Sequence, residues 1–285
     1  MLLMTRKYDR LKMLIAMGIY GSIGIFIHEI QLPRAAIALF RGVCGGAFLI
    51  LLFVITRRKF DFAALRGKML PLVISGVLMG LNWVFLFVAY DYAGVAVSTL
   101  CYYTAPMFVL LLSPLVLHEK LTARHVLCIF AALCGTALIS HITAPGNSFF
   151  GVLLALAAAL LYAAVIFFNK KLADAPAYER TVIQLLSSTL PLIPYVCLTA
   201  SPADLHTDAR TLIFLLTVGL LHTGVAYALY FDAVAKLPTR TVAMYAYLDP
   251  VLAVLFSVLF LGEPLTVYTV LGAALILGAA FVSER

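Results

Sequence analysis

Ten apolar segments dominate this sequence, and each is about as long as a helix must be to cross a bilayer. The hydrocarbon core is about 30 Å thick, which takes roughly 20 helical residues. Charged residues make up 12% of the chain, against about 25% in soluble domains. We therefore expect an all-α integral membrane protein with ten transmembrane helices, at roughly 12–30, 33–56, 69–90, 94–117, 123–142, 149–169, 181–200, 211–231, 240–261 and 265–283.

The basic residues are unevenly distributed between the two sides that these segments define. If successive connections alternate between sides, seventeen of the twenty Lys and Arg residues fall on the side of the termini. Only Arg34 and Arg210 fall on the other side, and Arg41 lies inside a span. Because Lys and Arg concentrate in cytoplasmic loops, we expect a multi-pass protein of the cell membrane with both termini cytoplasmic. Topology then explains the net charge of +7, and we expect no nucleic-acid partner.

An internal repeat divides the chain into two halves. Residues 98–122 align without a gap on residues 242–266, at an offset of 144. The aligned pairs there and upstream include Tyr103 with Tyr247, Pro106 with Pro250, Asp91 with Asp232 (offset 141) and Tyr20 with Tyr162 (offset 142). We expect a first repeat over 12–142 and a second over 149–283, with five spans each. Because five is odd, the second repeat enters the membrane from the opposite side, and the repeats are inverted.

An inverted repeat favours transport. Two similar halves in opposite orientation can exchange conformations and open one central site to each side in turn. The alternative is that the duplication only builds a large bundle, as in some channels and membrane enzymes.

The repeated motifs resemble those of a known family. The chain has L-H-E-K-L-T at 117–122 and L-G-E-P-L-T at 261–266, with I-Y-G-S-I-G-I-F in the first span, A-L-F-R-G around Arg41 and Y-L-D-P in the ninth. Together they resemble the EamA family of the drug/metabolite transporter superfamily, over residues 12–283. The resemblance implies ten spans as two EamA repeats and export or import of small metabolites. His118 stands where the usual pattern has glycine.

Two charged residues lie deep inside predicted spans. Arg41 is eight residues into the second span, and Asp249 is nine residues into the ninth, which places both near the middle of the bilayer. Ionisable groups at that depth are costly and are candidates for function. In one interpretation they neutralise each other or nearby helix ends. In the other, Arg41 binds an anionic substrate group and Asp249 is a proton-titrated or cation-binding carboxylate.

Other polar and aromatic residues fall within the predicted spans. Some of them lie too far from the span ends to form an interfacial belt, and others are close to those residues in the sequence. They suit a pocket for an amphipathic or cationic molecule, although packing is the alternative for each. The expected site consists of Arg41, Asn82, Trp83, Tyr102, Tyr103, Tyr162, His222, Tyr227, Tyr247 and Asp249. Pro106 and Pro250 are expected in mid-span, where each frees a backbone carbonyl. We expect the cavity walls to come mainly from spans 1, 3, 4, 6, 8 and 9, with spans 5 and 10 peripheral.

The sequence shows no phosphate-binding loop, no H-E-x-x-H and no paired His or Cys ligands. The five cysteines show no C-x-x-C spacing and are expected within spans as small apolar residues. We therefore expect neither a cofactor nor a metal, and an ion gradient, a substrate gradient or a partner protein must supply the energy. The alternative class is an intramembrane enzyme or lipid-handling protein that reacts through Asp249, His222 and Arg41. An inverted repeat is of no use to an enzyme.

The sequence thus predicts a secondary active transporter rather than an enzyme. It would move small polar or amphipathic, amino-acid-like metabolites by alternating access, as an exporter. Its partners would be the metabolite, the lipid bilayer and a proton or another coupling ion.

Overall fold

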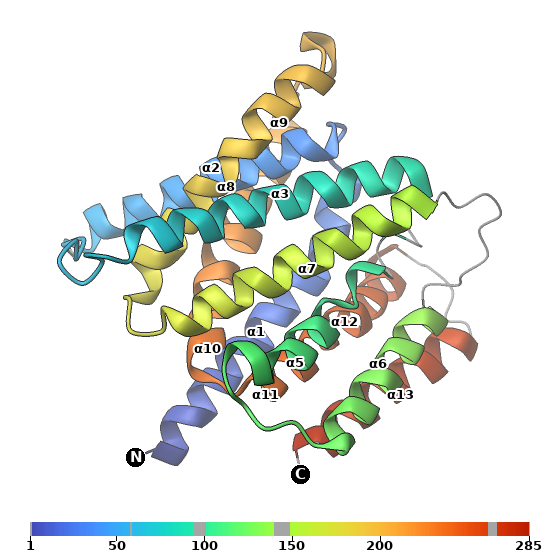
Figure 1. The fold of residues 1–285 in the computed structure, drawn as a ribbon. Helices are drawn as coiled ribbons and strands as arrows, with labels where there is room; N and C mark the ends of the chain where they lie inside the picture. The colour runs from blue at the N-terminus through green and yellow to red at the C-terminus, as the bar shows by residue number, and fades with distance from the viewer. Residues whose placement is uncertain are drawn as a thin grey trace.

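The computed structural model describes residues 2–57, 59–93, 98, 101–139, 149–261 and 267–284, and it is a bundle of helices (Figure 1). The elements of the first half are α1 (Leu2–His28), α2 (Arg34–Ile55), α3 (Met69–Ala93), α5 (Ala105–Val116) and α6 (Ala123–Ile139). Those of the second half are α7 (Phe149–Lys171), α8 (Ala177–Thr199), η1 (Pro202–Leu205), α9 (Ala209–Thr217), η2 (Val218–Val225), α10 (Ala226–Lys236), α11 (Thr239–Ala246), α12 (Leu248–Phe256), η3 (Ser257–Leu261) and α13 (Val267–Glu284).

Seven of the described helices are long and apolar enough to cross a membrane. Two of them are composite: α9, η2 and α10 form one continuous segment, and α11, α12 and η3 form another. Three shorter apolar helices lie within α5, α6 and α13, and α6 and α13 each adjoin residues outside the described ranges. The all-α architecture with ten helices that the sequence predicts is confirmed.

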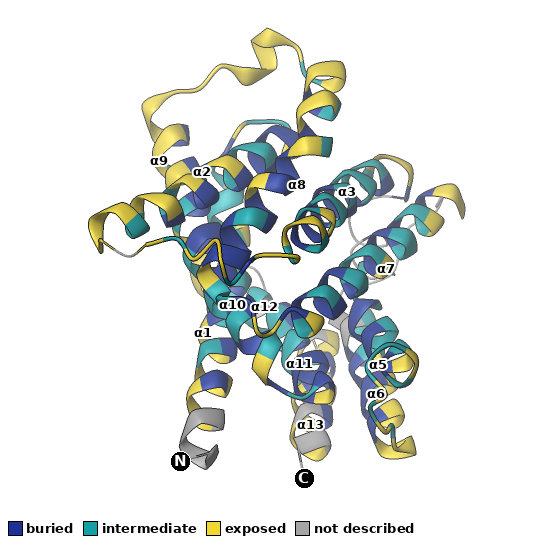
Figure 2. Ribbon diagram, turned by 60° about the vertical axis from the view of Figure 1, so that its left-hand side comes forward, coloured by how far each residue is buried: buried dark blue, intermediate teal, exposed yellow. Residues whose placement is uncertain are grey.

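Apolar side chains cover the outside of the bundle. Leu198 is 86% exposed, and Leu115 and Phe149 are each 75% exposed. Figure 2 shows exposed residues along the outer faces of the helices, while the faces between helices are buried. A water-soluble surface would not carry so many exposed large hydrophobic residues, whereas lipid accepts them.

Two spans are interrupted just before the aligned prolines. Pro106 lies in the first turn of α5, and Pro250 lies in the first turn of α12. The expected mid-span position is therefore also the start of a new helix, where proline is tolerated because its missing N–H has no intrahelical partner. These breaks place Tyr103 just before the start of α5 and Asp249 in the first turn of α12.

The helices group into two bundles, and each bundle contains the counterparts, in the other half of the chain, of the helices in the other bundle. Bundle A consists of α1, α2, α9–η2–α10 and α11–α12, with α1 packed on α10 and α12 and α2 packed on η2. Bundle B consists of α3, α5, α7 and α8, with α3 packed on α7 and α8 and α5 packed on α7. When each helix is replaced by its counterpart in the other half of the chain, the contacts of bundle A become those of bundle B. The pair α6 and α13 packs together beside the bundles and maps onto itself.

The bundles meet where α2 packs on α8. A Cβ atom added to Gly42 would lie 3.4 Å from the carbonyl oxygen of Leu185. These residues are 143 positions apart, as are the first residues of α2 and α8. The contact therefore maps onto itself when the halves are exchanged, which places the pseudo-two-fold axis beside it.

The turn after α5 explains one departure from the repeat motif. His118 has a φ of +55°, in the left-handed region that costs a residue with a side chain roughly 1–2 kcal/mol. The aligned residue in the second copy is Gly262, which belongs to residues 262–266, outside the described part of the chain. The position thus calls for glycine, and the first repeat accommodates histidine there.

The start of α1 and the end of α13 lie at the same end of the bundle (Figures 1 and 2), which we call the terminal end. A network of ion pairs joins α1 to α10 there: Lys12 lies 2.5 Å from Asp232, and Lys236 lies 2.6 Å from Asp232. At the opposite end, Arg210 forms an ion pair with Glu29. Asp208 caps α9 there, and hydrogen bonding with Thr211 lowers the pKa of Asp208.

Candidate functional site

A cavity of about 540 Å³ lies between the two bundles. It extends from the middle of the molecule to Arg34, the first residue of α2, at the opposite end. Bundle A contributes residues from α1, α2, α10, α11 and α12. The other side is formed by Trp83 and neighbours on α3, by Tyr162 on α7, and by Tyr102, Tyr103, Ala105 and Pro106 at and just before the start of α5. A space of this size between helices is typical of a small-molecule site.

Arg41 is the cation in the middle of the cavity. Its Nε donates a hydrogen bond to Thr223 Oγ1 at 2.9 Å, and its guanidinium carbon lies 5.6 Å from the centre of the Trp83 ring. Thr223 belongs to η2, a π-helical segment within the bundle A span, and its hydroxyl donates to the carbonyl of Val218. The hydrogen bond from the π-helical segment and the indole ring thus hold the guanidinium at the cavity wall.

Asp249 lines the same cavity from the first turn of α12. A carboxylate there is favoured by the positive end of the helix dipole. Among the described residues, no ion pair within 4.0 Å joins Asp249 to Arg41 or to any other cation. Mutual neutralisation by direct contact is therefore not what the structure shows. The two opposite charges face one cavity separately.

Tyrosine rings form much of the wall between these charges. Tyr20 packs edge-on against Tyr227 and Tyr230, with ring centres 5.4 and 5.8 Å apart. Tyr102 and Tyr162 lie 5.8 Å apart on the other side. The Tyr20 hydroxyl has no hydrogen-bond partner among the described residues. Ring faces and hydroxyls together give a wall that accepts both apolar and polar groups.

The cavity ends where the two bundles touch. Tyr162 of bundle B donates a hydrogen bond to the Tyr230 hydroxyl of bundle A at 2.9 Å. Beyond this contact, Lys170 on α7 donates to the carbonyl of Leu237 at 2.7 Å, and Arg180 on α8 donates to the carbonyl of Phe231 at 2.8 Å. These cross-bundle contacts close the terminal end.

The structure brings most of the predicted site residues together. Those that line the cavity are Arg41, Trp83, Tyr102, Tyr103, Tyr162, Tyr227 and Asp249. Whether they bind a substrate stays a prediction.

Three predicted residues do not line the cavity. Asn82 is fully buried behind it, where its Nδ2 donates to the carbonyl of Ala158 at 2.6 Å. His222 lies 3.0 Å from Ser22 Oγ and packs on Phe26. Tyr247 is fully buried in a separate cluster with residues of α5, α6 and α13. The position of a residue along a span does not show which face of the helix it occupies, and these three side chains lie on faces turned away from the cavity lining.

Sequence reasoning missed Arg34 and Tyr90 at the opposite end of the cavity, and left Tyr20 out of the site. The guanidinium carbon of Arg34 lies 4.8 Å from the centre of the Tyr90 ring. Arg34 is at a predicted span boundary, where it reads as a topology signal. Tyr20 could have been found because it aligns with Tyr162. The expected walls also omitted span 2, which supplies Arg34, Ile37, Ala38 and Arg41.

Within the described part of the chain, no three His, Cys, Asp or Glu side chains come together as metal ligands would. The cysteines Cys44, Cys101, Cys128, Cys134 and Cys197 are free thiols.

Family comparison identifies the class of protein. The model of the EamA-like transporter family matches residues 10–141 and again residues 149–284. The chain therefore belongs to the EamA-like transporter family, as its motifs suggest, with two EamA domains. It is a multi-pass membrane transporter of small metabolites and not an enzyme, which removes the intramembrane-enzyme alternative.

Individual relatives agree with this assignment. The chain is 31% identical to the uncharacterized transporter YxxF of Bacillus subtilis over 270 residues, which cover 93% of this chain and 86% of YxxF. It is 27% identical to the threonine/homoserine exporter RhtA of Escherichia coli, over 84% of this chain and 78% of RhtA. A protein of known crystal structure has the same fold, with a TM-score of 0.85, 20% identity and 96% coverage of both chains.

Proposed function

We propose that this protein is a secondary active exporter of zwitterionic, amino-acid-like metabolites that works by alternating access. The observation that carries the proposal is that Arg41 and Asp249 line one cavity without pairing with each other. Arg41 binds the substrate carboxylate and Asp249 binds its ammonium group. A zwitterion satisfies both charges at once, whereas a singly charged molecule leaves one of them unpaired at bilayer depth.

The cavity wall adds a size and polarity preference. About 540 Å³ accommodates an amino acid with its remaining hydration. The rings of Trp83 and Tyr227, 6.3 Å apart, favour a side chain with an apolar portion. The named activity of RhtA, export of threonine and homoserine, belongs to the same chemical class.

The proposal includes a direction of transport and a coupling mechanism. The two inverted repeats, 12–142 and 149–283, exchange conformations so that the cavity opens to each side in turn. With the termini in the cytoplasm of a cell-membrane protein, the opposite end faces the exterior, and the cavity described is the outward-facing state. Protonation of Asp249 from outside releases the ammonium group, which couples export to proton entry.

The test is transport of radiolabelled L-threonine in proteoliposomes by the wild-type protein, Arg41→Gln and Asp249→Asn. Each site variant removes a charge-assisted contact, so we expect at least a tenfold loss of initial rate, from roughly 1.5–3 kcal/mol. Tyr247→Phe is the matched control, because Tyr247 is buried at similar depth but outside the cavity, and it keeps the wild-type rate.

Wild-type rates in both site variants, with protein that elutes as a single species in detergent, would show that neither charge binds substrate. Transport abolished by Arg41→Gln but independent of Asp249→Asn at every pH would remove the coupling role of Asp249 alone.

A further inference from the structure

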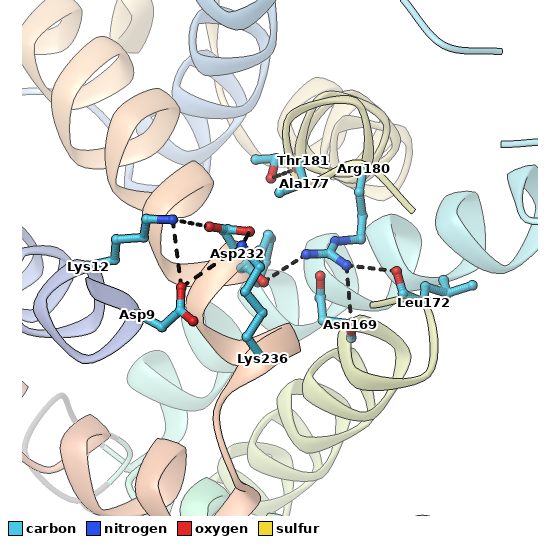
Figure 3. Close-up of polar contacts among 10 residues, drawn as sticks. Asp9, Lys12, Asn169, Leu172, Ala177, Arg180, Thr181, Asp232 and Lys236 are labelled. Carbon is cyan, nitrogen blue, oxygen red and sulfur yellow. Dashed lines mark hydrogen bonds and ion pairs between the residues drawn. The ribbon is translucent and has the colours of Figure 1, made fainter. Parts of the chain in front are cut away.

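Arg180 is a buried cation that has no carboxylate partner among the described residues. It lies in the first turns of α8 at the terminal end and is 1% exposed. Figure 3 shows its guanidinium surrounded by backbone carbonyls: Nη1 donates to Leu172 at 2.8 Å and to Asn169 at 3.4 Å, and Nη2 donates to Phe231 at 2.8 Å. Its Nε has no partner among the described residues. A buried charge held only by carbonyls is costly.

Two carboxylates near Arg180, those of Asp232 and Asp174, are paired with other cations. Asp232 lies next to the Phe231 carbonyl in sequence, and it pairs with Lys12 and Lys236 (Figure 3). Asp174 pairs with Lys68 at 2.6 Å. Arg180 is therefore left as a cation without an ion pair, although acidic residues are nearby.

Two other buried side chains, on α7 and α8, also have an oxygen without a partner among the described residues. The Oδ1 of Asn169 and the Oε1 of Gln184 are buried and have no hydrogen-bond partner in the described structure. Asn169 contributes a carbonyl to Arg180, and Gln184 lies one helical turn after Arg180 on α8. Buried polar groups are rarely left unpaired. A cluster of them is explained if a second conformation supplies their partners.

That second conformation is the one in which the two halves of the chain have exchanged their conformations. On α2, the residues that line the cavity include Ile37, Ala38 and Arg41. Adding the offset of 143 that relates α2 to α8 gives Arg180, Thr181 and Gln184. On α1, Ile27 also lines the cavity, and the offset of 142 gives Asn169. The unsatisfied cluster thus occupies the positions that line the cavity in the exchanged state.

We propose that Arg180, with Asn169 and Gln184, forms a second substrate-binding position that takes the carboxylate of the transported metabolite when the terminal end is open. It rests on the proposed alternating-access function. In the state described, the Phe231 carbonyl of bundle A fills one side of the guanidinium. When bundle A moves away from bundle B, that carbonyl is withdrawn, and a carboxylate replaces it with a stronger, bidentate contact.

The test measures charge selectivity at Thr181, the residue next to Arg180, which is fully buried in the state described. Thr181→Cys is made in a background that lacks the five native cysteines and is reconstituted in proteoliposomes. Labelling rates are compared for an anionic sulfonatoethyl and a cationic trimethylammonioethyl methanethiosulfonate, each applied from the terminal side. We expect labelling from that side, with the anionic reagent favoured roughly tenfold by the nearby guanidinium.

Arg180→Gln should abolish this preference, and Arg180→Lys should restore most of it. Lys236→Gln is the matched control, because it removes a nearby cation that is already paired with Asp232, and it leaves the preference intact. Leu185 lies where the backbone of α8 meets Gly42 on α2, and its counterpart Gly42 does not line the cavity, so Leu185→Cys should stay unlabelled. A merely structural Arg180 would change labelling by both reagents equally.

Either of two results overturns the proposal: Thr181→Cys unlabelled from the terminal side, or a preference for the anionic reagent that Arg180→Gln leaves unchanged. Protection of Thr181→Cys by L-threonine is a separate measurement. If the charge preference depends on Arg180 but L-threonine neither protects nor is transported, the binding position stands and the amino-acid assignment fails.

Discussion

The two ends of the bundle interface are built from equivalent parts but are in different states. At the terminal end, Arg180 of bundle B donates to the carbonyl of Phe231 in bundle A, and the contact is buried. At the opposite end, Arg34 of bundle A lies over the ring of Tyr90 in bundle B, and both line the cavity. Tyr90 and Phe231 are counterparts at an offset of 141. An arginine near the start of α2 or α8 therefore meets the same position of the opposing bundle at each end.

This comparison shows which contacts hold the terminal end of the bundle interface closed. Tyr162 reaches Tyr230 across the interface, whereas its counterpart Tyr20 has an unpartnered hydroxyl. The position equivalent to Tyr230 is Ala89, which offers no hydroxyl. The terminal end thus holds a Tyr162–Tyr230 hydrogen bond whose counterpart is not formed between the described residues Tyr20 and Ala89, which favours the conformation described.

The largest expected effect on stability concerns the packing of α3 on α8 within bundle B. A Cβ atom at Gly76 on α3 would lie 2.5 Å from the carbonyl oxygen of Gln184 on α8. We expect Gly76→Val to lower the free energy of unfolding by about 3 kcal/mol, because rigid backbone must move. Unfolding followed by SDS titration checks this. Gly18→Ala, where nothing lies within 4 Å, should show no loss. A Gly76 variant as stable as wild type would mean that α3 and α8 do not pack as described.

A smaller effect is expected at the floor of the cavity. Tyr162→Phe removes the hydrogen bond to Tyr230 and should cost about 1 kcal/mol of stability. Tyr20→Phe removes a hydroxyl without a partner and should cost nothing. The same SDS titration compares the two. Equal losses in both variants would contradict the claim that only the terminal end is held by this contact.

The smallest expected effect is a difference in stability between variants of the aligned residues Asp91 and Asp232. Asp232 joins α10 to α1 through Lys12 and Lys236, whereas Asp91 at the opposite end is exposed and has no ion pair with a described residue. We expect Asp232→Asn to lower stability by less than about 1 kcal/mol, because the pairs are partly exposed, and Asp91→Asn to change nothing. A larger loss in Asp91→Asn would show that the opposite end is held by charge after all.

Much of this arrangement is predictable from the sequence, for physical reasons. The length of the apolar runs follows from bilayer thickness, and the repeat follows from aligned residues such as Pro106 and Pro250. Depth in the membrane follows from position along a span, which is why Arg41 and Asp249 were found. The face of a helix does not follow from depth. For that reason Asn82, His222 and Tyr247 were expected in the cavity, which they do not line. Arg34 and Tyr90 were missed because they lie at the predicted ends of spans, where arginine is a topology signal and tyrosine an interfacial residue.

The role of Arg180 needed the structure. Its sequence position beside a predicted span gives it the appearance of a topology residue, like the other cations on the side of the termini. Only its burial and its carbonyl partners distinguish it. Likewise, the π-helical turn that brings Thr223 to Arg41 has no sequence signal that we recognise.

Distance measurement between the bundles at both ends tests the central claim most directly. Spin labels at Tyr8 on α1 and Lys171 on α7 report the terminal end, and labels at Tyr92 on α3 and Leu212 on α9 report the opposite end; all four residues are exposed. In nanodiscs, double electron–electron resonance should show two distances for each pair. Added L-threonine or a change of pH should lengthen one pair while it shortens the other. A single unchanged distance at both ends, or changes in the same direction, would contradict exchange between the two bundles.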